Sequence, residues 1–258
     1  MFKKLISRIT GGGSTPAATS NPAPAPAEPP AASPAEEAVL RQIAERSAED
    51  PLIGAKIGSR YLTQHVLAAM KTERGVHIES FLCALGALAG YACQASVRAQ
   101  ALARGLPETA LFTEAKTKDG RTFYFGDALN KPLAESEYSV WGLAAFGAQE
   151  AGCAQLPEVE PIFAHVAATV GSEEFGKPRT PADHPVHELP IVYLRALWPA
   201  LAPTIRKFCT DPAHWPVLVG LSVQEAIGMG KQALDPCLGL RIVMESAIPM
   251  SKVDLAAA

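Results

Sequence analysis

The longest apolar stretch of the chain runs from Ile78 to Leu102 and has the period of an α-helix. Large side chains form one stripe along it, and small ones, including Gly86 and Gly90, form a second. A helix that is apolar on two faces belongs in a protein interior, with its small-residue stripe against a close neighbour. We expect that neighbour to be the glycine-rich helix at 214–234. Because polar residues bracket the uncharged run, we predict an interior scaffold and no transmembrane span.

Apolar periodicity, capping residues and prolines predict further helices on both sides of this one. They cover residues 35–50, 53–74, 136–151, 157–170, 189–209 (bent at Pro199 and Pro203), 212–234 and 237–248. Residues 110–126, with an Asp119-Gly120 turn, alternate as a β-hairpin does. The predicted fold class is therefore mainly α: a single helical domain of eight or nine helices over 35–258, with one β-hairpin.

The first nine residues have apolar side chains at the spacing of an amphipathic helix and basic side chains between them. So short a helix is marginal alone in water, which favours folding on a surface: an anionic membrane or a groove on a protein partner. The predicted docking residues are Phe2, Lys3, Lys4, Leu5, Ile6, Arg8 and Ile9. Residues 10–34 are rich in proline and alanine, which predicts a disordered, semi-rigid linker.

Charge and cysteine usage narrow the class of protein. The net charge is −3, and the basic residues near the start leave the rest of the chain more acidic still. A mildly acidic body lacks the basic surface of a nucleic-acid-binding protein, so we expect no nucleic-acid partner. The five cysteines are scattered, odd in number and never form a CxxC pair. We therefore expect unpaired packing residues and a cytoplasmic location.

The long polar segment 171–188 carries the residues best suited to chemistry. A loop of this length in a compact domain is usually functional or disordered, and its three prolines favour a fixed shape. Imidazole and carboxylate groups suit zinc or another divalent metal, and the candidate ligands are His165, His184, His187 and Glu188. The spacing matches no short zinc motif, and a solvent-facing loop remains the alternative. Lys177 and Arg179 are candidates for binding an anion or a substrate.

One further motif is incomplete. Gly228 to Ala233 matches G-x-G-x-x-A, but a dinucleotide site needs a strand directly before the first glycine. The preceding residues have a helical pattern, so glycine for close helix packing is the better interpretation.

The sequence leaves two main functional hypotheses and identifies no catalytic residue. The first is a cytoplasmic interaction or adaptor module, recruited to a membrane surface or a protein assembly through its N-terminal helix. The alternative is a metal-dependent, hydrolase-like enzyme that uses the loop 171–188. A third, weaker hypothesis is a small apolar ligand bound between helices, where glycines leave narrow pockets.

Overall fold

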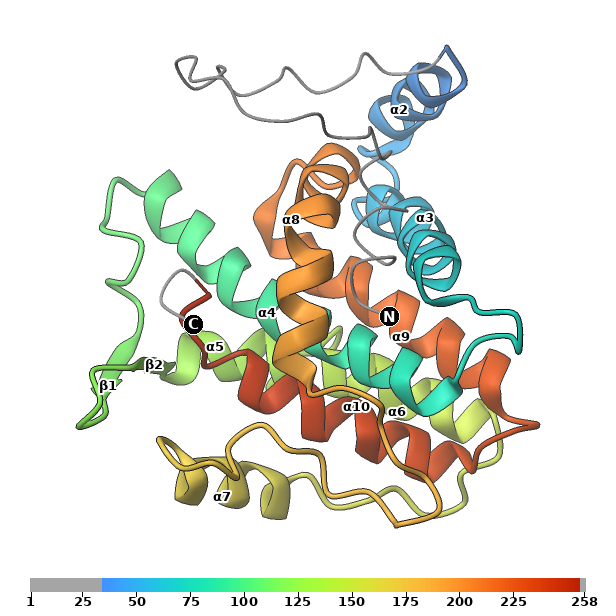
Figure 1. The fold of residues 1–258 in the computed structure, drawn as a ribbon. Coiled ribbons are helices and arrows are strands. Elements are labelled where there is room, and N and C mark those ends of the chain that lie inside the picture. The colour runs from blue at the N-terminus through green and yellow to red at the C-terminus, as the bar shows by residue number, and fades with distance from the viewer. Residues whose placement is uncertain (1–33, 256–258) are drawn as a thin grey trace, which may run out of the picture.

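The computed structural model describes residues 34–255, and the predictions for residues 1–33 lie outside that range. It is mainly helical with one antiparallel hairpin, which confirms the predicted fold class (Figure 1). The helices are α2 (Pro34–Arg46), α3 (Ile53–Met70), α4 (Ile78–Ala103), α5 (Asp127–Asn130), α6 (Val140–Glu150), α7 (Glu160–Thr169), α8 (Pro190–Phe208), α9 (Trp215–Gly230) and α10 (Pro236–Met250). The strands are β1 (Thr113–Lys116) and β2 (Thr122–Phe125), and two short turns are η1 (Lys131–Glu135, π-helical) and η2 (Pro212–His214, 3₁₀).

Helix α4 is the scaffold of the fold, packed against α8, α9 and α10 (Figure 1). Among residues 34–255 it is the one helix long and apolar enough to cross a membrane. However, 89% of its most apolar window is buried inside the protein. Burial of this much apolar surface is the main favourable term in folding, so α4 acts as the core that the other helices cover.

The small-residue stripe of α4 packs against α10, so the prediction that it faces α9 is wrong. A Cβ added at Gly90 would lie 1.9 Å from the carbonyl oxygen of Ala247, and one at Gly86 would lie 2.5 Å from that of Val243. Only glycine permits backbones to approach this closely. On α9, Gly220 instead faces the Leu143 side chain of α6. The sequence pattern showed that the small-residue stripe needs a closely packed helix. It did not identify that helix, because several later helices contain small residues.

The hairpin is confirmed, and the chain after α10 extends it. Phe123 of β2 forms an antiparallel bridge with Val253, and the Tyr124 amide donates to the Lys252 carbonyl oxygen at 2.9 Å. The buried side chain of Gln94 donates from Nε2 to the Val253 carbonyl oxygen, also at 2.9 Å. The two strands, marginal by themselves, thereby gain a third segment and an anchor on α4.

The predicted helix boundaries differ from the structure at several points. Helix α8 continues through Pro199 and Pro203 without an interruption in its helical assignment. Residues 127–135, for which no helix was predicted, form α5 and η1. Helix α6 begins after Ser139 rather than Ser136, because the Ser139 hydroxyl accepts the Gly142 amide at 3.1 Å.

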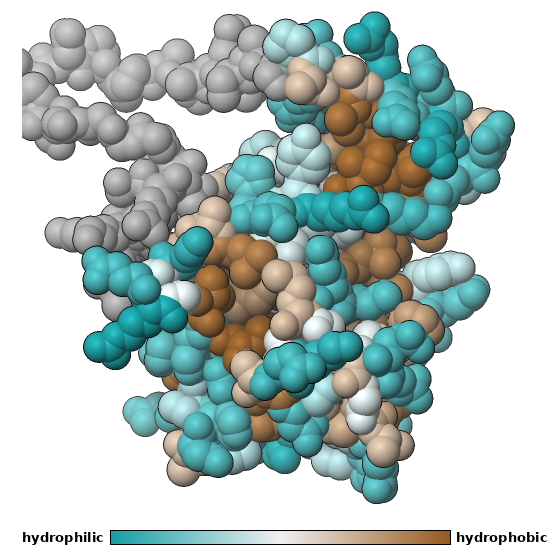
Figure 2. All heavy atoms as spheres, turned by 90° about the vertical axis from the view of Figure 1, so that its right-hand side faces the viewer, coloured by the Kyte–Doolittle hydropathy of each residue, from teal (hydrophilic) through white to brown (hydrophobic). Residues whose placement is uncertain are grey.

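Among the α-helices of residues 34–255, α2 is the one with no buried residue. It lies against α3. Figure 2 shows apolar surface in the upper part of the molecule, where these two helices lie. Its Glu36 carboxylate pairs with Lys207 of α8 at 2.5 Å. An ion pair at the surface contributes little, so α2 is held mainly by its partly buried apolar side chains.

Candidate functional site

Two histidines of the long loop meet the start of α4, where five residues form what we call the polar cluster. Its members are His77, Glu79, Ser80, His184 and His187. Glu79 bridges two imidazoles: its Oε1 lies 2.9 Å from His184 Nδ1, and its Oε2 lies 3.2 Å from His77 Nε2. The His77 and His187 rings stack with centroids 3.9 Å apart. The cluster thus fastens the loop to the scaffold helix.

The charges within the polar cluster follow from these contacts. The hydrogen bond to Glu79 raises the pKa of His184. Burial acts to raise the pKa of Glu79, but the hydrogen bond from His184 outweighs it with the help of both neighbouring imidazoles, and the net pKa is lowered. Burial lowers the pKa of His77 more than the nearby Glu79 carboxylate raises it, and charge repulsion from His187 lowers it further. The contacts therefore favour the charged forms of Glu79 and His184 and disfavour a positive charge on His77.

A serine, a histidine and a carboxylate lie in the order used by serine hydrolases, but the serine is closed to substrate. Ser80 Oγ lies 2.9 Å from His77 Nδ1, whose other ring nitrogen faces Glu79. However, Ser80 is 2% exposed, and its oxygen already accepts the His187 backbone N–H at 3.1 Å. A substrate could reach this hydroxyl only after the loop had left. The arrangement caps α4 and holds the loop.

The structure does not assemble the predicted metal site. His184 and His187 are brought together, but with His77 and Glu79 instead of His165 and Glu188. His165 lies half-buried on α7, and Glu188 is exposed. Among residues 34–255, no three His, Cys, Asp or Glu side chains are placed so that they could hold a metal ion. Sequence alone could not show that a carboxylate 105 residues earlier binds His184.

The two cations predicted to hold an anion are separated. Lys177 pairs with Glu174 at 2.9 Å on the surface. Arg179 instead reaches Glu245 of α10, whose side chain is 2% exposed, at 2.7 Å from Nη2 and 2.9 Å from Nε. Arg241 was missed, although its i, i+4 spacing from Glu245 on one helix was a signal in the sequence. Arg179 thereby anchors the loop to α10.

An open groove of about 510 Å³ lies between α3, α6 and α9, and we call it the α3–α6–α9 groove. Its lining includes Leu221, Gly147 and Gly228. A Cβ added at Gly228 would meet no atom within 4 Å, so this glycine faces open space. The charged residues that line the groove are Lys56, Arg60, Lys231, Glu150 and Glu225. Phe146 and Met229, adjacent in sequence to two lining glycines, are 53% and 52% exposed.

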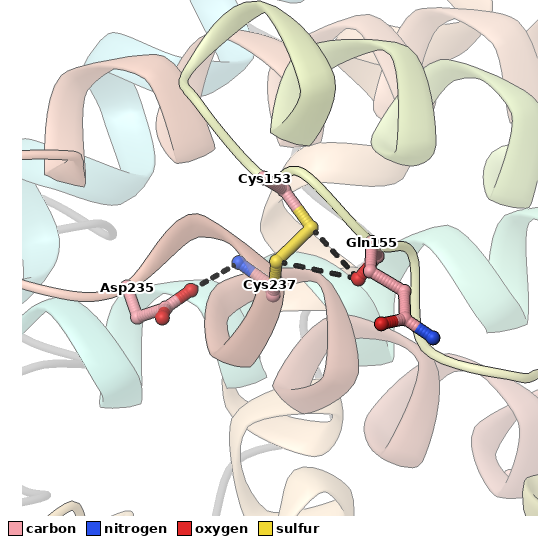
Figure 3. The surroundings of a disulfide bond; sticks show 4 residues. All are labelled: Cys153, Gln155, Asp235 and Cys237. Atoms are coloured by element: carbon pink, nitrogen blue, oxygen red, sulfur yellow. Dashed lines mark hydrogen bonds between the residues drawn. A yellow bond between two sulfur atoms is a disulfide. The ribbon is translucent and has the colours of Figure 1, made fainter.

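Two cysteines are joined, so the prediction that all five are unpaired is wrong for these. Cys153, just after α6, is bonded to Cys237 in the first turn of α10 (Figure 3). Both sulfurs lie against the Gln155 carbonyl oxygen, at 3.4 and 3.5 Å. Asp235 caps α10 by accepting the Cys237 amide at 2.7 Å. A separation of 84 residues hid this pairing from the sequence. The unbonded, buried cysteines are Cys83, Cys93 and Cys209.

The sequence pattern did not indicate that one lysine is buried. Lys252, directly after α10, is 3% exposed, and its Nζ donates to Asn130 Oδ1 at 3.3 Å. The ammonium also faces the rings of Phe125 and Phe163 at 5.5 and 5.8 Å. Burial lowers the pKa of Lys252 to about 8. The side chain is enclosed, so it is a core residue and not a nucleophile within reach of a substrate.

The predicted docking residues Phe2 to Ile9 lie outside the described residues. The motif 228–233 begins inside α9, whose last residue is Gly230, so a helix and not a strand precedes its first glycine, as the pattern indicated. No family model matches the sequence, and no curated protein or solved structure is significantly similar to it.

Proposed function

We propose that the protein is a helical interaction module, and that its body binds a partner segment in the α3–α6–α9 groove. Residues 1–9 would recruit it to an anionic membrane surface or a protein assembly. The observation that carries the proposal is the groove itself. It is open, and it combines apolar surface with charged rims, as binding sites for helical segments do.

The groove differs from the polar cluster in having open space for a ligand. Leu221 supplies apolar surface, and Gly228 leaves open space on α9, whereas Gly147 permits α6 to pack closely against Gln224 of α9. Phe146 of α6 and Met229 of α9 do not line the groove, but each is exposed next to a lining glycine and is a large apolar group of the type enriched at interfaces. A partner that covers these residues would remove apolar area from water, which is the main driving force for association.

The charges favour an amphipathic helix that carries charges of both signs as the partner. Lys56 is paired with Asp50 at 2.7 Å, whereas the hydrogen bond from the Thr63 hydroxyl at 3.0 Å leaves the Glu225 carboxylate charged. The other lining charges are Arg60, Lys231 and Glu150. Charges of both signs on the partner would pair with these groups at the rim, while an apolar face contacts Leu221.

Site-specific crosslinking tests this proposal. We expect a photo-crosslinker at Phe146 to capture one partner in cells, through a segment that is helical and amphipathic. Gly228→Leu, which fills open space without touching the core, should abolish that product. A crosslinker at the exposed Ala168 of α7 is the matched control and should give none. A product that survives Gly228→Leu, or forms equally at Ala168, contradicts the proposal.

The recruitment part is tested separately with residues 1–34 fused to a fluorescent protein. We expect the fusion to concentrate at a membrane or an assembly, and Leu5→Glu with Ile6→Glu to release it because charges interrupt the apolar face. Diffuse fluorescence of the unmodified fusion would rule out this part alone. The alternative of a metal-dependent hydrolase is not carried further, because the described residues assemble no ligand set for it.

A further inference from the structure

We propose that the protein has a second site, separate from the α3–α6–α9 groove, that binds the anionic group of a small organic phosphate. The site is a cavity of about 270 Å³ beside α10, which we call the arginine cavity. Its lining residues are Pro157, Glu158, Pro161, Ile162, Arg179 and Arg241. They come from three separate parts of the chain: the start of α7 with the segment before it, the long loop, and α10.

A buried carboxylate fixes both arginines from behind. Glu245 accepts the Arg179 backbone N–H at 3.2 Å and faces its Nη2 at 2.7 Å. Arg241 approaches the same carboxylate from one turn away, with Nε at 3.5 Å. A guanidinium has five N–H donors, and these contacts use only some of them. The Nη1 group of Arg179 and both terminal groups of Arg241 remain for a ligand.

Position and charge make those donors suitable for an anion. The Arg179 and Arg241 side chains are 37% and 44% exposed, so both lie at the wall of the cavity while Glu245 is buried. Two guanidinium groups face the single buried carboxylate of Glu245, while Glu158 adds a second carboxylate to the lining. The attraction for phosphate therefore comes from the N–H donors of the arginines that point into the cavity, not from the net charge of the site. Because Glu245 already orders Arg179, little side-chain entropy remains to be lost on binding.

The other walls define the rest of the ligand. Pro157, Pro161 and Ile162 present apolar surface beside the arginines, which suits an organic phosphate better than the bare ion. Glu158, exposed and part of the lining, opposes an anion through like charge. Its removal should therefore strengthen binding, whereas a purely structural role for the arginines predicts no such response.

Calorimetric titration of the full-length protein with phenyl phosphate tests the site. We expect Arg241→Gln to weaken binding about 10-fold or more, since a charge-assisted contact is lost while Arg179 still holds Glu245. Glu158→Gln should tighten binding by about 2-fold or more, as like charge is removed. Lys177→Gln is the matched control, because this cation lies in the same loop but does not line the cavity, and it should leave affinity unchanged.

A second arm separates the two sources of such a phosphate. Vesicles of phosphatidylcholine with phosphatidic acid are compared with phenyl phosphate for wild type and Arg241→Gln. Arg241-dependent binding of the soluble compound indicates a free metabolite, and Arg241-dependent binding of the vesicles alone indicates a lipid headgroup. If neither ligand binds, or if Arg241→Gln changes neither affinity, the proposal is overturned. Neither result bears on the groove, which these substitutions do not touch.

Discussion

The polar cluster and the arginine cavity both receive charged residues from the same long loop. They differ in whether hydrogen-bonding groups remain without a partner inside the protein. In the polar cluster, Glu79 contacts two imidazoles and the Ser80 oxygen accepts a backbone amide. In the arginine cavity, Arg179 and Arg241 share one buried carboxylate and keep donors at an open wall. In the polar cluster, the side chains use their hydrogen-bonding groups on one another, so their role is structural. In the arginine cavity, open space and N–H donors without a partner remain, so the site is suited to binding.

Glycines show the same contrast between closed and open surroundings. Gly90 permits α4 and α10 to touch, whereas Gly228 faces the empty part of the α3–α6–α9 groove. Both lie in helices, so intrinsic propensity alone would predict the same response to alanine or leucine at each position. Their environments predict opposite responses.

The largest effect is expected for Gly90→Leu. Its Cβ alone would lie 1.9 Å from the Ala247 carbonyl oxygen, so α4 and α10 would have to separate. We expect a loss of about 3 kcal/mol or more in the free energy of unfolding, measured by urea titration. Gly228→Ala is the control and should gain up to about 1 kcal/mol. Equal effects at the two positions would contradict the contrast.

The next effect concerns the disulfide, which ties the segment before α7 to α10 near the arginine cavity. Replacing Cys153 and Cys237 together by serine frees a closed loop of 84 residues. We expect stability to fall by about 2–4 kcal/mol. Phenyl phosphate binding should also weaken, because Pro157 and Arg241 lie four residues after the two cysteines. Loss of stability with unchanged binding would show that the disulfide does not hold the cavity in shape.

Lys252 is a buried cation, in contrast to the partly exposed Arg241. Its folded-state pKa of about 8 lies below the unfolded value of 10.5, so between these values the unfolded chain binds more protons and stability rises with pH. The gain from pH 7 to pH 9.5 is about 2 kcal/mol. The thiols of Cys83 and Cys209, with pKa values raised to about 12, titrate in the opposite sense.

The measurement therefore compares the pH dependence of the free energy of unfolding between wild type and Lys252→Met. Both proteins contain the buried thiols, so their contribution cancels in the difference. Urea unfolding at pH 7 and pH 9.5 should show wild type gaining about 2 kcal/mol relative to the variant. Parallel pH profiles would mean that Lys252 is not buried as a charge.

The smallest effect is expected for His184→Gln in the polar cluster. The pKa of His184 is raised in the folded protein, so its contribution to loop docking is present below pH 6.5 and is lost as pH rises through the folded value. Hydrogen exchange of residues 177–189 should therefore speed up with rising pH in wild type more than in the variant. Because His77 has a lowered pKa and opposes this trend, the comparison again uses the difference.

The sequence predicted the helical fold and the hairpin because both depend on local patterns: apolar periodicity, caps and an Asp-Gly turn. For the 171–188 loop it predicted a fixed shape, and in the structure His184, His187 and Arg179 attach this loop to α4 and α10. What it could not supply were the partners, since Glu79 and Glu245 lie 105 and 66 residues away along the chain. The sequence showed which side chains could act as ligands, but it did not show that these side chains would pair with other residues of the chain.

The groove and the disulfide were missed for the same reason. Lining residues such as Arg60, Gly147 and Gly228 come from three helices, and no periodicity relates one helix to another. Cys153 and Cys237 each lie at the end of a helix, where packing of free cysteine is an equally good interpretation. Tertiary contacts of this kind carry no local signal.

The most direct test of the account compares one open and one closed position in the same binding assay. The partner segment captured at Phe146 is titrated against wild type, Gly228→Leu and His184→Gln, with unfolding curves confirming that each variant is folded. We predict that Gly228→Leu loses at least about 10-fold in affinity, since it occupies the groove, and that His184→Gln binds as wild type does. Unchanged affinity for Gly228→Leu together with a loss for His184→Gln would contradict the account and move the functional surface to the polar cluster.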